Sequence, residues 1–152
     1  MQPANNLGYL LQHVATVMAK QADQLLQEQL GIGLSQFKIL MVLQKNSQVQ
    51  QNFIAERLGQ TEAGISRQIK ILQDKDLLTA KRNPLNLRER ITMPTIKGSA
   101  LTTRAMEVLA KDFEPVFGSM GEGHLKQLTD NLKALHTEIC QPGKTGSCDH
   151  HV

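Results

Sequence analysis

The chain has 152 residues, of which 40% are hydrophobic and 20% are charged, with a formal net charge of +3. This length and composition fit one folded domain, with or without a helical arm, and exclude a disordered chain. We expect a cytoplasmic protein without membrane contact, because no secretory signal pattern opens the chain and no apolar run reaches the roughly 18 residues of a membrane span.

The first part of the chain predicts two helices. Apolar residues recur at spacings of three or four along residues 6–30, which is typical of an amphipathic helix. Gly31 and Gly33 end this helix, and Ser35 is predicted to cap the next one, SQFKILMVLQK. The run 39–43 in this second helix is apolar all round, so we expect it deep in the core.

Two shorter helices joined by a tight turn are predicted next. The third helix runs from about Gln50 to Leu58 and is ended by Gly59. Thr61 is predicted to cap a fourth helix that continues to about Asp74. Two short helices with a glycine in the turn between them predict a helix-turn-helix, whose second helix enters the major groove of DNA.

The fourth helix has one apolar face and one outer face. A helical wheel turns Ile65, Ile69 and Leu72 inward. The outer face holds Ala63, Ser66, Arg67, Lys70 and Asp74. Its small residues let the backbone approach the bases, so that Arg67 and Lys70 can reach guanine acceptors or phosphates. The alternative is that the two cations only solvate an ordinary surface helix.

A basic hairpin follows the helix-turn-helix. The segments LLTAKR, NPLNLR and ERITMP predict two short strands around a loop, and Pro94 ends the second strand. Four cations surround the loop: Lys81, Arg82, Arg88 and Arg90. From Gln60 to Lys97 there are eight cations against four anions, a local charge of +4 that leaves −1 for the rest of the chain. The pattern predicts a winged helix whose wing lies along the DNA backbone or reaches the minor groove.

The last part of the chain predicts two long helices and a flexible tail. Thr95 is expected to cap a helix through Phe113, and Pro115 is expected to kink or end it. The final helix, about Glu122 to Cys140, carries a heptad seam of Leu125, Leu128, Leu132, Leu135 and Ile139. Packing within one subunit would explain this seam, but the terminal helices exceed what one small winged-helix core needs, which favours a dimer.

Both cysteines lie near the C-terminus. Oxidation of Cys140 and Cys148 could join them within or between subunits, which is a hypothesis for a redox switch. The run Cys148, Asp149, His150 and His151 offers zinc or copper ligands, but so short a mobile run favours incidental binding, and we predict no metal site or cofactor. The sequence has no P-loop, nucleophile elbow or HExxH motif, so we do not expect an enzyme.

The residues from about Leu34 to Gly98 resemble the MarR (multiple antibiotic resistance regulator) family of winged-helix transcription factors. The segments that carry the resemblance are LSQFKILMVL, IAERLG, GISRQIKILQDKDLL and TIKG, in this order and spacing. The resemblance implies a homodimer, joined through its terminal helices, on a pseudo-palindromic operator. By position, Ser66, Arg67 and Lys70 match the family's groove-facing residues, and Gln60, Thr61 and Ala63 match the start of the recognition helix.

The wing departs from the family pattern. The family usually has an aspartate and two arginines where this chain has Asn86, Leu87 and Arg88, and a leucine where it has Pro94. Only Arg88 matches, so the usual carboxylate support for a wing arginine is absent and Arg90 or Arg82 can share its role.

The resemblance also implies an effector site between the DNA-binding lobe and the dimerisation helices. Tyr9, His13, Phe37 and Met41 are the candidate lining residues for a small aromatic or anionic molecule. Plain packing, or solvation in the case of His13, is the alternative for each.

The sequence thus predicts a mainly α fold with a winged helix-turn-helix and long terminal helices. The expected parts are an N-terminal dimerisation helix at 1–33, the DNA-binding domain at 34–94 with its wing at about 79–92, C-terminal dimerisation helices at 95–140 and a flexible tail at 141–152. The expected function is a dimeric DNA-binding regulator, more often a repressor, that a small molecule or an oxidant releases. The alternatives are a thiol-based version of the same regulator and a helical protein-interaction module that never binds DNA.

Overall fold

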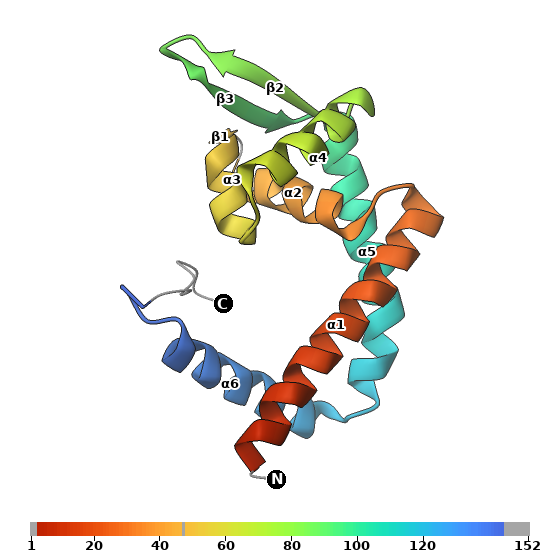
Figure 1. Cartoon of the computed structure of the whole chain (residues 1–152). Helices are drawn as coiled ribbons and strands as arrows, with labels where there is room; N and C mark the ends of the chain where they lie inside the picture. Colours follow the sequence, from red (N-terminus) through yellow and green to blue (C-terminus); the bar gives the residue numbers. More distant parts are fainter. Residues whose placement is uncertain (1–2, 47, 145–152) are drawn as a thin grey trace. The chain divides into compact units, whose positions relative to one another are not determined.

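The computed structural model describes residues 3–46 and 48–144, which form six helices and three short strands (Figure 1). The elements in chain order are α1 (Pro3–Leu30), α2 (Leu34–Lys45), β1 (Val49–Gln50), α3 (Gln51–Leu58), α4 (Glu62–Asp74), β2 (Leu78–Asn83), β3 (Asn86–Pro94), α5 (Ile96–Gly118) and α6 (Glu122–Ile139). The predicted mainly helical fold with a winged helix-turn-helix is confirmed. Among the described residues, no helix is both long enough and apolar enough to cross a membrane.

The chain forms two compact units, Met1–Leu109 and Ala110–Val152. The first unit holds α1, the helix-turn-helix, the hairpin and the first half of α5. The second holds the rest of α5 together with α6.

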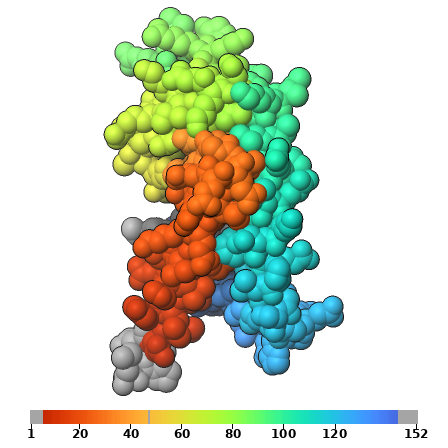
Figure 2. All heavy atoms as spheres, turned by 90° about the vertical axis from the view of Figure 1, so that its right-hand side faces the viewer, coloured from red at the N-terminus to blue at the C-terminus, as the bar shows by residue number. Residues whose placement is uncertain are grey.

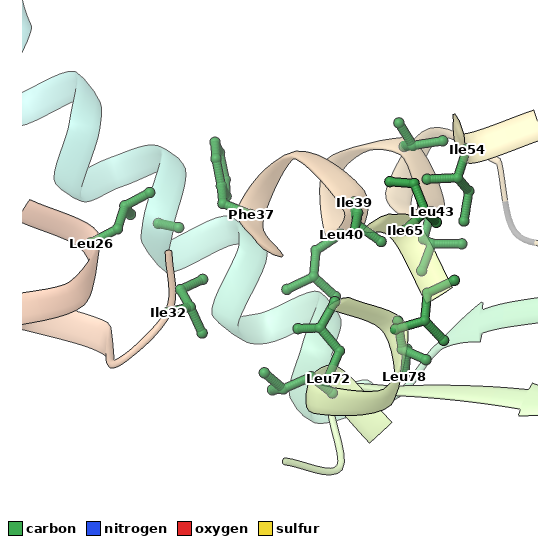
Figure 3. Packing of buried hydrophobic residues seen from close by; sticks show 14 of the residues in the cluster. Leu26, Ile32, Phe37, Ile39, Leu40, Leu43, Ile54, Ile65, Leu72 and Leu78 are labelled. Carbon is green, nitrogen blue, oxygen red and sulfur yellow. The ribbon is translucent and has the colours of Figure 1, made fainter. Parts of the chain in front are cut away.

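The core of the first unit is built mainly from α2, α3 and α4, and it includes Leu26 of α1 and Ala105 of α5 (Figure 3). Ile65, Ile69 and Leu72, the predicted inner face of α4, are all 0% exposed. In α2, Ile39, Leu40 and Leu43 are also fully buried, as expected. Burying a side chain of this size contributes roughly 1.5–3 kcal/mol. The recognition helix is therefore fixed by its apolar face, and its outer face is left for other contacts.

The start of α2 corrects one prediction. The helix begins at Leu34 with Gly33 as its N-cap, so Ser35 lies inside the helix and does not cap it. The cap comes from α1: the backbone N–H of Leu34 donates to Oδ1 of Asp23 at 2.7 Å. The Gln36 side chain accepts the Gly33 N–H at 3.3 Å. A carboxylate near the positive end of a helix also stabilises it electrostatically.

The three strands form an antiparallel sheet in the order β1-β3-β2. The hairpin of β2 and β3 was predicted, whereas the two-residue strand β1 was not. Val49 of β1 pairs with Thr92, whose hydroxyl donates to the Val49 carbonyl at 2.9 Å. This pairing attaches the base of the wing to the chain segment that opens the helix-turn-helix. Figure 2 shows the wing, in green, beside α4 at one end of the first unit.

Pro115 does not end its helix, which was one of the two outcomes expected for it. Helix α5 continues through this residue to Gly118. A proline inside a helix removes one backbone hydrogen bond and crowds the carbonyl four residues earlier, here that of Lys111. Both residues are exposed, so water can satisfy that carbonyl, and less than one more turn of helix follows.

Gly98 lets α5 pack directly against the turn between α4 and β2. The Thr95 side chain caps α5 as predicted, accepting the Gly98 N–H at 2.9 Å and donating to the Asp76 carbonyl at 2.7 Å. A Cβ on Gly98 would overlap the carbonyl oxygen of Leu77. Only glycine permits this approach, which fixes the C-terminal end of the recognition helix.

Alanine at Gly98 is therefore expected to lower the free energy of unfolding by about 1–3 kcal/mol, because backbone must move to admit the methyl group. Urea denaturation followed by circular dichroism measures the change. Gly123→Ala is the matched control, since a Cβ there meets no atom within 4 Å. Equal stability of the two variants would contradict the packing role of Gly98.

Candidate nucleic-acid interface

The turn between α3 and α4 has the geometry that the sequence predicted. Gly59 ends α3 in the left-handed region, with φ 61°. Thr61 is the N-cap of α4, and its hydroxyl accepts the Gly64 N–H at 3.1 Å. The Gln60 side chain donates to the Ser35 hydroxyl at 3.5 Å, so it spans from the turn to α2. These contacts set the angle at which α4 leaves the turn.

The outer face of α4 is open. Ala63, Arg67 and Lys70 are exposed, and Ser66 is half-buried. The Arg67 Nε lies 3.5 Å from the Ala63 carbonyl, a long contact that holds the side chain along the helix. A low surface at Ala63 with a guanidinium one turn later fits the floor of a major groove.

The wing places two arginines directly opposite each other. Arg82 of β2 pairs with Arg90 of β3 across the strands, and both are exposed. Like charges at opposed positions repel, and a bound phosphate would relieve that repulsion. Within residues 3–46 and 48–144 the only ion pair joins Lys126 to Asp130. The cations of α4 and of the wing are thus without carboxylate partners in the described part of the chain.

The single acid of the wing joins its two strands to β1. The Glu89 carboxylate accepts from the Gln50 side chain at 2.7 Å and from the Asn83 side chain at 3.0 Å. This network was missed in the sequence, although one acid among four basic residues of a hairpin was a signal for it. At the tip, the Asn86 side chain accepts the Arg88 backbone N–H at 3.2 Å, so it supports the turn and not the guanidinium.

A polar depression joins the recognition helix to the wing. It has a volume of about 340 Å³. Its lining consists of Gln50, Gln51, Asn52, Glu62, Ser66, Arg88, Glu89 and Arg90. The structure therefore brings Ser66, Arg88 and Arg90 together, as the winged-helix prediction requires. Lys81 and Arg82 are exposed elsewhere on the same hairpin.

The four candidate effector residues do not gather in one place. Tyr9 and His13 stack on each other on α1 with ring centroids 5.7 Å apart, and Tyr9 is 63% exposed. Phe37 is part of the buried core, and Met41 packs at its edge. None of the four lines the depression beside the wing or either of the two pockets described next.

Two further pockets lie within the first unit. The larger, about 1030 Å³, is a polar groove along α1 and the start of α2 that includes Asp23, Gln36 and Gln68. The smaller, about 420 Å³, has an apolar floor that includes Leu77 and Leu101. Lys75, Lys97 and Arg104 are the cations of its lining. An apolar floor with cations beside it fits an organic anion.

The proposed thiol switch is only partly described. Cys140 is the half-buried C-cap of α6, and its backbone N–H donates to the His136 carbonyl at 2.8 Å. Cys148, Asp149, His150 and His151 lie outside the described residues. Among the described residues, no group of three His, Cys, Asp or Glu side chains could hold a metal ion.

The chain is similar to proteins of known family. Residues 30–89 match the model of the MarR family. No curated protein matches the chain in sequence.

Solved structures share the fold. A MarR-like transcription regulator from Bacillus cereus superposes with a TM-score of 0.80 at 20% identity, covering 90% of this chain and 97% of that one. MepR from S. aureus, solved as a complex with DNA, gives a TM-score of 0.72 at 23% identity over 88% of this chain and 97% of that one. CouR from Rhodococcus jostii, bound to p-coumaroyl-CoA, gives 0.71 at 18% identity over 85% and 90%.

Proposed function

The chain belongs to the MarR family, and from this membership we propose that it is a cytoplasmic, homodimeric repressor of transcription. It binds a pseudo-palindromic operator and leaves it when a small molecule, or an oxidant acting on the terminal cysteines, arrives. The observation that carries the proposal is the set of cations without carboxylate partners on α4 and on the neighbouring wing.

The two groups of cations do different work. Arg67 and Lys70 on α4 face the bases and the phosphates beside them, while Gln60, Thr61, Ala63 and Ser66 form the low surface that lets the helix enter the groove. Lys81, Arg82, Arg88 and Arg90 neutralise phosphates along the flanking backbone. The opposed pair Arg82 and Arg90 supports this role, because a bound phosphate between two like charges lowers their mutual repulsion.

Dimerisation is proposed through the terminal helices, with 1–33 and 95–140 as dimerisation segments, 34–94 as the DNA-binding domain and 141–152 as a tail. The support comes from α6, in which no residue is buried although it carries a heptad seam. Leu128, Leu132 and Ile139 are between 39% and 52% exposed. Apolar residues at heptad spacing bury themselves against another helix, and a second subunit supplies one.

Release by a small anionic molecule is supported by the pocket of Lys75, Lys97 and Arg104. The Lys75 ammonium donates to the Gly31 carbonyl at 2.6 Å and the Lys97 ammonium to the Lys75 carbonyl at 2.8 Å. These two bonds join the end of α4 to the end of α1 and to α5. An anion that draws either ammonium away loosens the support of the recognition helix.

Selection of bound sequences from random duplexes tests the proposal. We expect an inverted repeat to be enriched, and the logarithm of its binding constant to fall linearly with the logarithm of salt concentration. The slope should be roughly −4 to −10, since each neutralised phosphate contributes about −0.9. A protein-interaction module without DNA binding would enrich no sequence and would show no salt-dependent duplex binding at all.

A further inference from the structure

The tip of the wing is apolar, although the rest of the hairpin is basic. Leu85 is 95% exposed and Leu87 is 67% exposed. Among the described residues of the first unit, only Ile96, at 93%, exposes a large hydrophobic side chain about as fully as Leu85, and it lies beyond the opposite end of the hairpin. Neither leucine belongs to the hydrophobic core or to the residues packed against it. The tip thus carries an apolar surface that does not contribute to the hydrophobic core.

The turn that carries these leucines is held by hydrogen bonds. The Asn83 side chain accepts the Leu85 N–H at 3.0 Å, and the Asn86 side chain accepts the Arg88 N–H at 3.2 Å. Glu89 ties Asn83 to Gln50 at the base of the wing. The leucines therefore project from an ordered turn, which lowers the entropy lost when a partner immobilises them.

The surroundings of the tip select the partner. Arg82 and Arg88 flank the turn, and the one acid of the hairpin, Glu89, is half-buried in the base network. An apolar point between cations fits the minor groove of DNA, which has phosphates along both walls and sugar edges and base steps between them. An apolar protein surface would leave the flanking guanidinium groups desolvated and without counter-charge.

We propose that Leu85 and Leu87 form an apolar wedge that enters the minor groove beside each half-site and partly unstacks one base step. The inference rests on the proposed DNA-binding function and adds a specificity element to it. Pyrimidine–purine steps such as TA and CA unstack most easily, so the operator should carry one where the wing tip lands, outside the bases that α4 contacts.

The experiment uses the full chain and the best duplex from the random selection, with 2-aminopurine placed in turn at each adenine of the flanks. The fluorescence of this base rises when it unstacks. We expect the wild-type protein to raise the signal at one flanking step, and the double variant Leu85→Ser, Leu87→Ser to leave it at the level of free DNA. The affinity of the double variant should fall about tenfold or more, from the lost apolar contact.

The salt dependence separates the wedge from the cations. The double variant keeps every charge, so its slope against salt should equal that of the wild type, whereas Arg88→Ala should reduce the slope by about 1 per subunit. Ile96→Ser removes an equally exposed apolar side chain away from the tip. Because residue 96 opens a proposed dimerisation segment, light scattering should first show that this variant has the mass of the wild type, and its affinity and fluorescence should then equal those of the wild type. Thermal denaturation should show the same Tm for all these proteins, since each altered side chain is exposed.

Three results would overturn the wedge. The first is tight operator binding by the wild type with no rise in fluorescence at any position. The second is unchanged affinity and fluorescence in the double variant. The third is a change of oligomeric state in the double variant with normal DNA binding, which would make the tip a contact between copies. Failure of the wild type to bind any duplex would remove the proposed function itself, so the two failures are distinguishable.

Discussion

Alanine at Arg67 should weaken binding to the selected operator by about 1–3 kcal/mol per half-site and leave binding to random DNA almost unchanged. The reason is its position on the exposed face of α4, one turn after Ala63. Ala63 lies in the first turn of the helix, and its small side chain lets the backbone come close to the bases. A guanidinium there can donate two parallel hydrogen bonds to the O6 and N7 atoms of a guanine. Within the described part of the chain, its side chain makes one hydrogen bond, the long 3.5 Å approach to the Ala63 carbonyl, so little is lost when it turns to DNA.

Two further variants make this test selective. Arg67→Lys keeps the charge without the forked geometry, so it should lose most of the discrimination and little of the binding to random DNA. Arg88→Ala removes a charge from the wing and should weaken all duplexes by a similar factor. Titrations of each variant against operator and random duplexes, at one salt concentration, give the comparison. Equal and sequence-blind losses for Arg67→Ala and Arg88→Ala would contradict the division between base and phosphate contacts.

Local rules accounted for much of the fold. The helical period of 3.6 residues placed Ile65, Ile69 and Leu72 inside. The capping preferences of glycine and threonine placed the end of α3 at Gly59 and the start of α4 at Thr61. In each case the relevant contact joins residues that are near each other in the sequence. Thr61, for example, accepts a hydrogen bond from a residue only three positions ahead.

The misses involve partners that are distant in the chain. Ser35 was predicted as the cap because its side chain is suitable. The group that accepts the hydrogen bond from the Leu34 N–H is instead the carboxylate of Asp23, eleven residues before it. The strand β1 has two residues and exists only because β3, more than 40 positions later, pairs with it. Periodicity and propensity carry no information about such contacts.

The candidate site shows the same division. The basic residues of α4 and the wing are visible in the sequence, as is the departure at Asn86 and Leu87. The role of Glu89 is not, because its partner Gln50, 39 positions earlier, meets it only when β1 is added to the sheet. The exposure of Leu85, 95%, also required the structure, since the sequence of a loop does not show whether another part of the chain covers its leucine.

Glutamate at both Leu128 and Leu132 should give a monomer and lower operator affinity by about 10²- to 10⁴-fold. Both side chains are on the heptad seam of α6 and about 40% exposed, and a charge at either position would lie in the proposed contact between subunits. Loss of the dimer makes each half-site bind alone, which removes the gain from linked binding. Light scattering after size-exclusion chromatography measures the mass, and titration of the selected duplex measures the affinity.

The same two added charges on the opposite side of the helix provide the control. Gln127 and Thr137 are exposed and lie off the seam, so glutamate at both should leave a dimer with nearly normal DNA binding. This comparison removes the effect of making the protein more acidic, which alone weakens attraction to DNA. The first unit contains the whole helix-turn-helix and wing, so a folded monomer should still bind random DNA weakly and in a salt-dependent way. A seam variant that stays dimeric and keeps its operator affinity would place the subunit contact elsewhere. A monomeric seam variant with full operator affinity would mean that a single subunit is enough to recognise the operator.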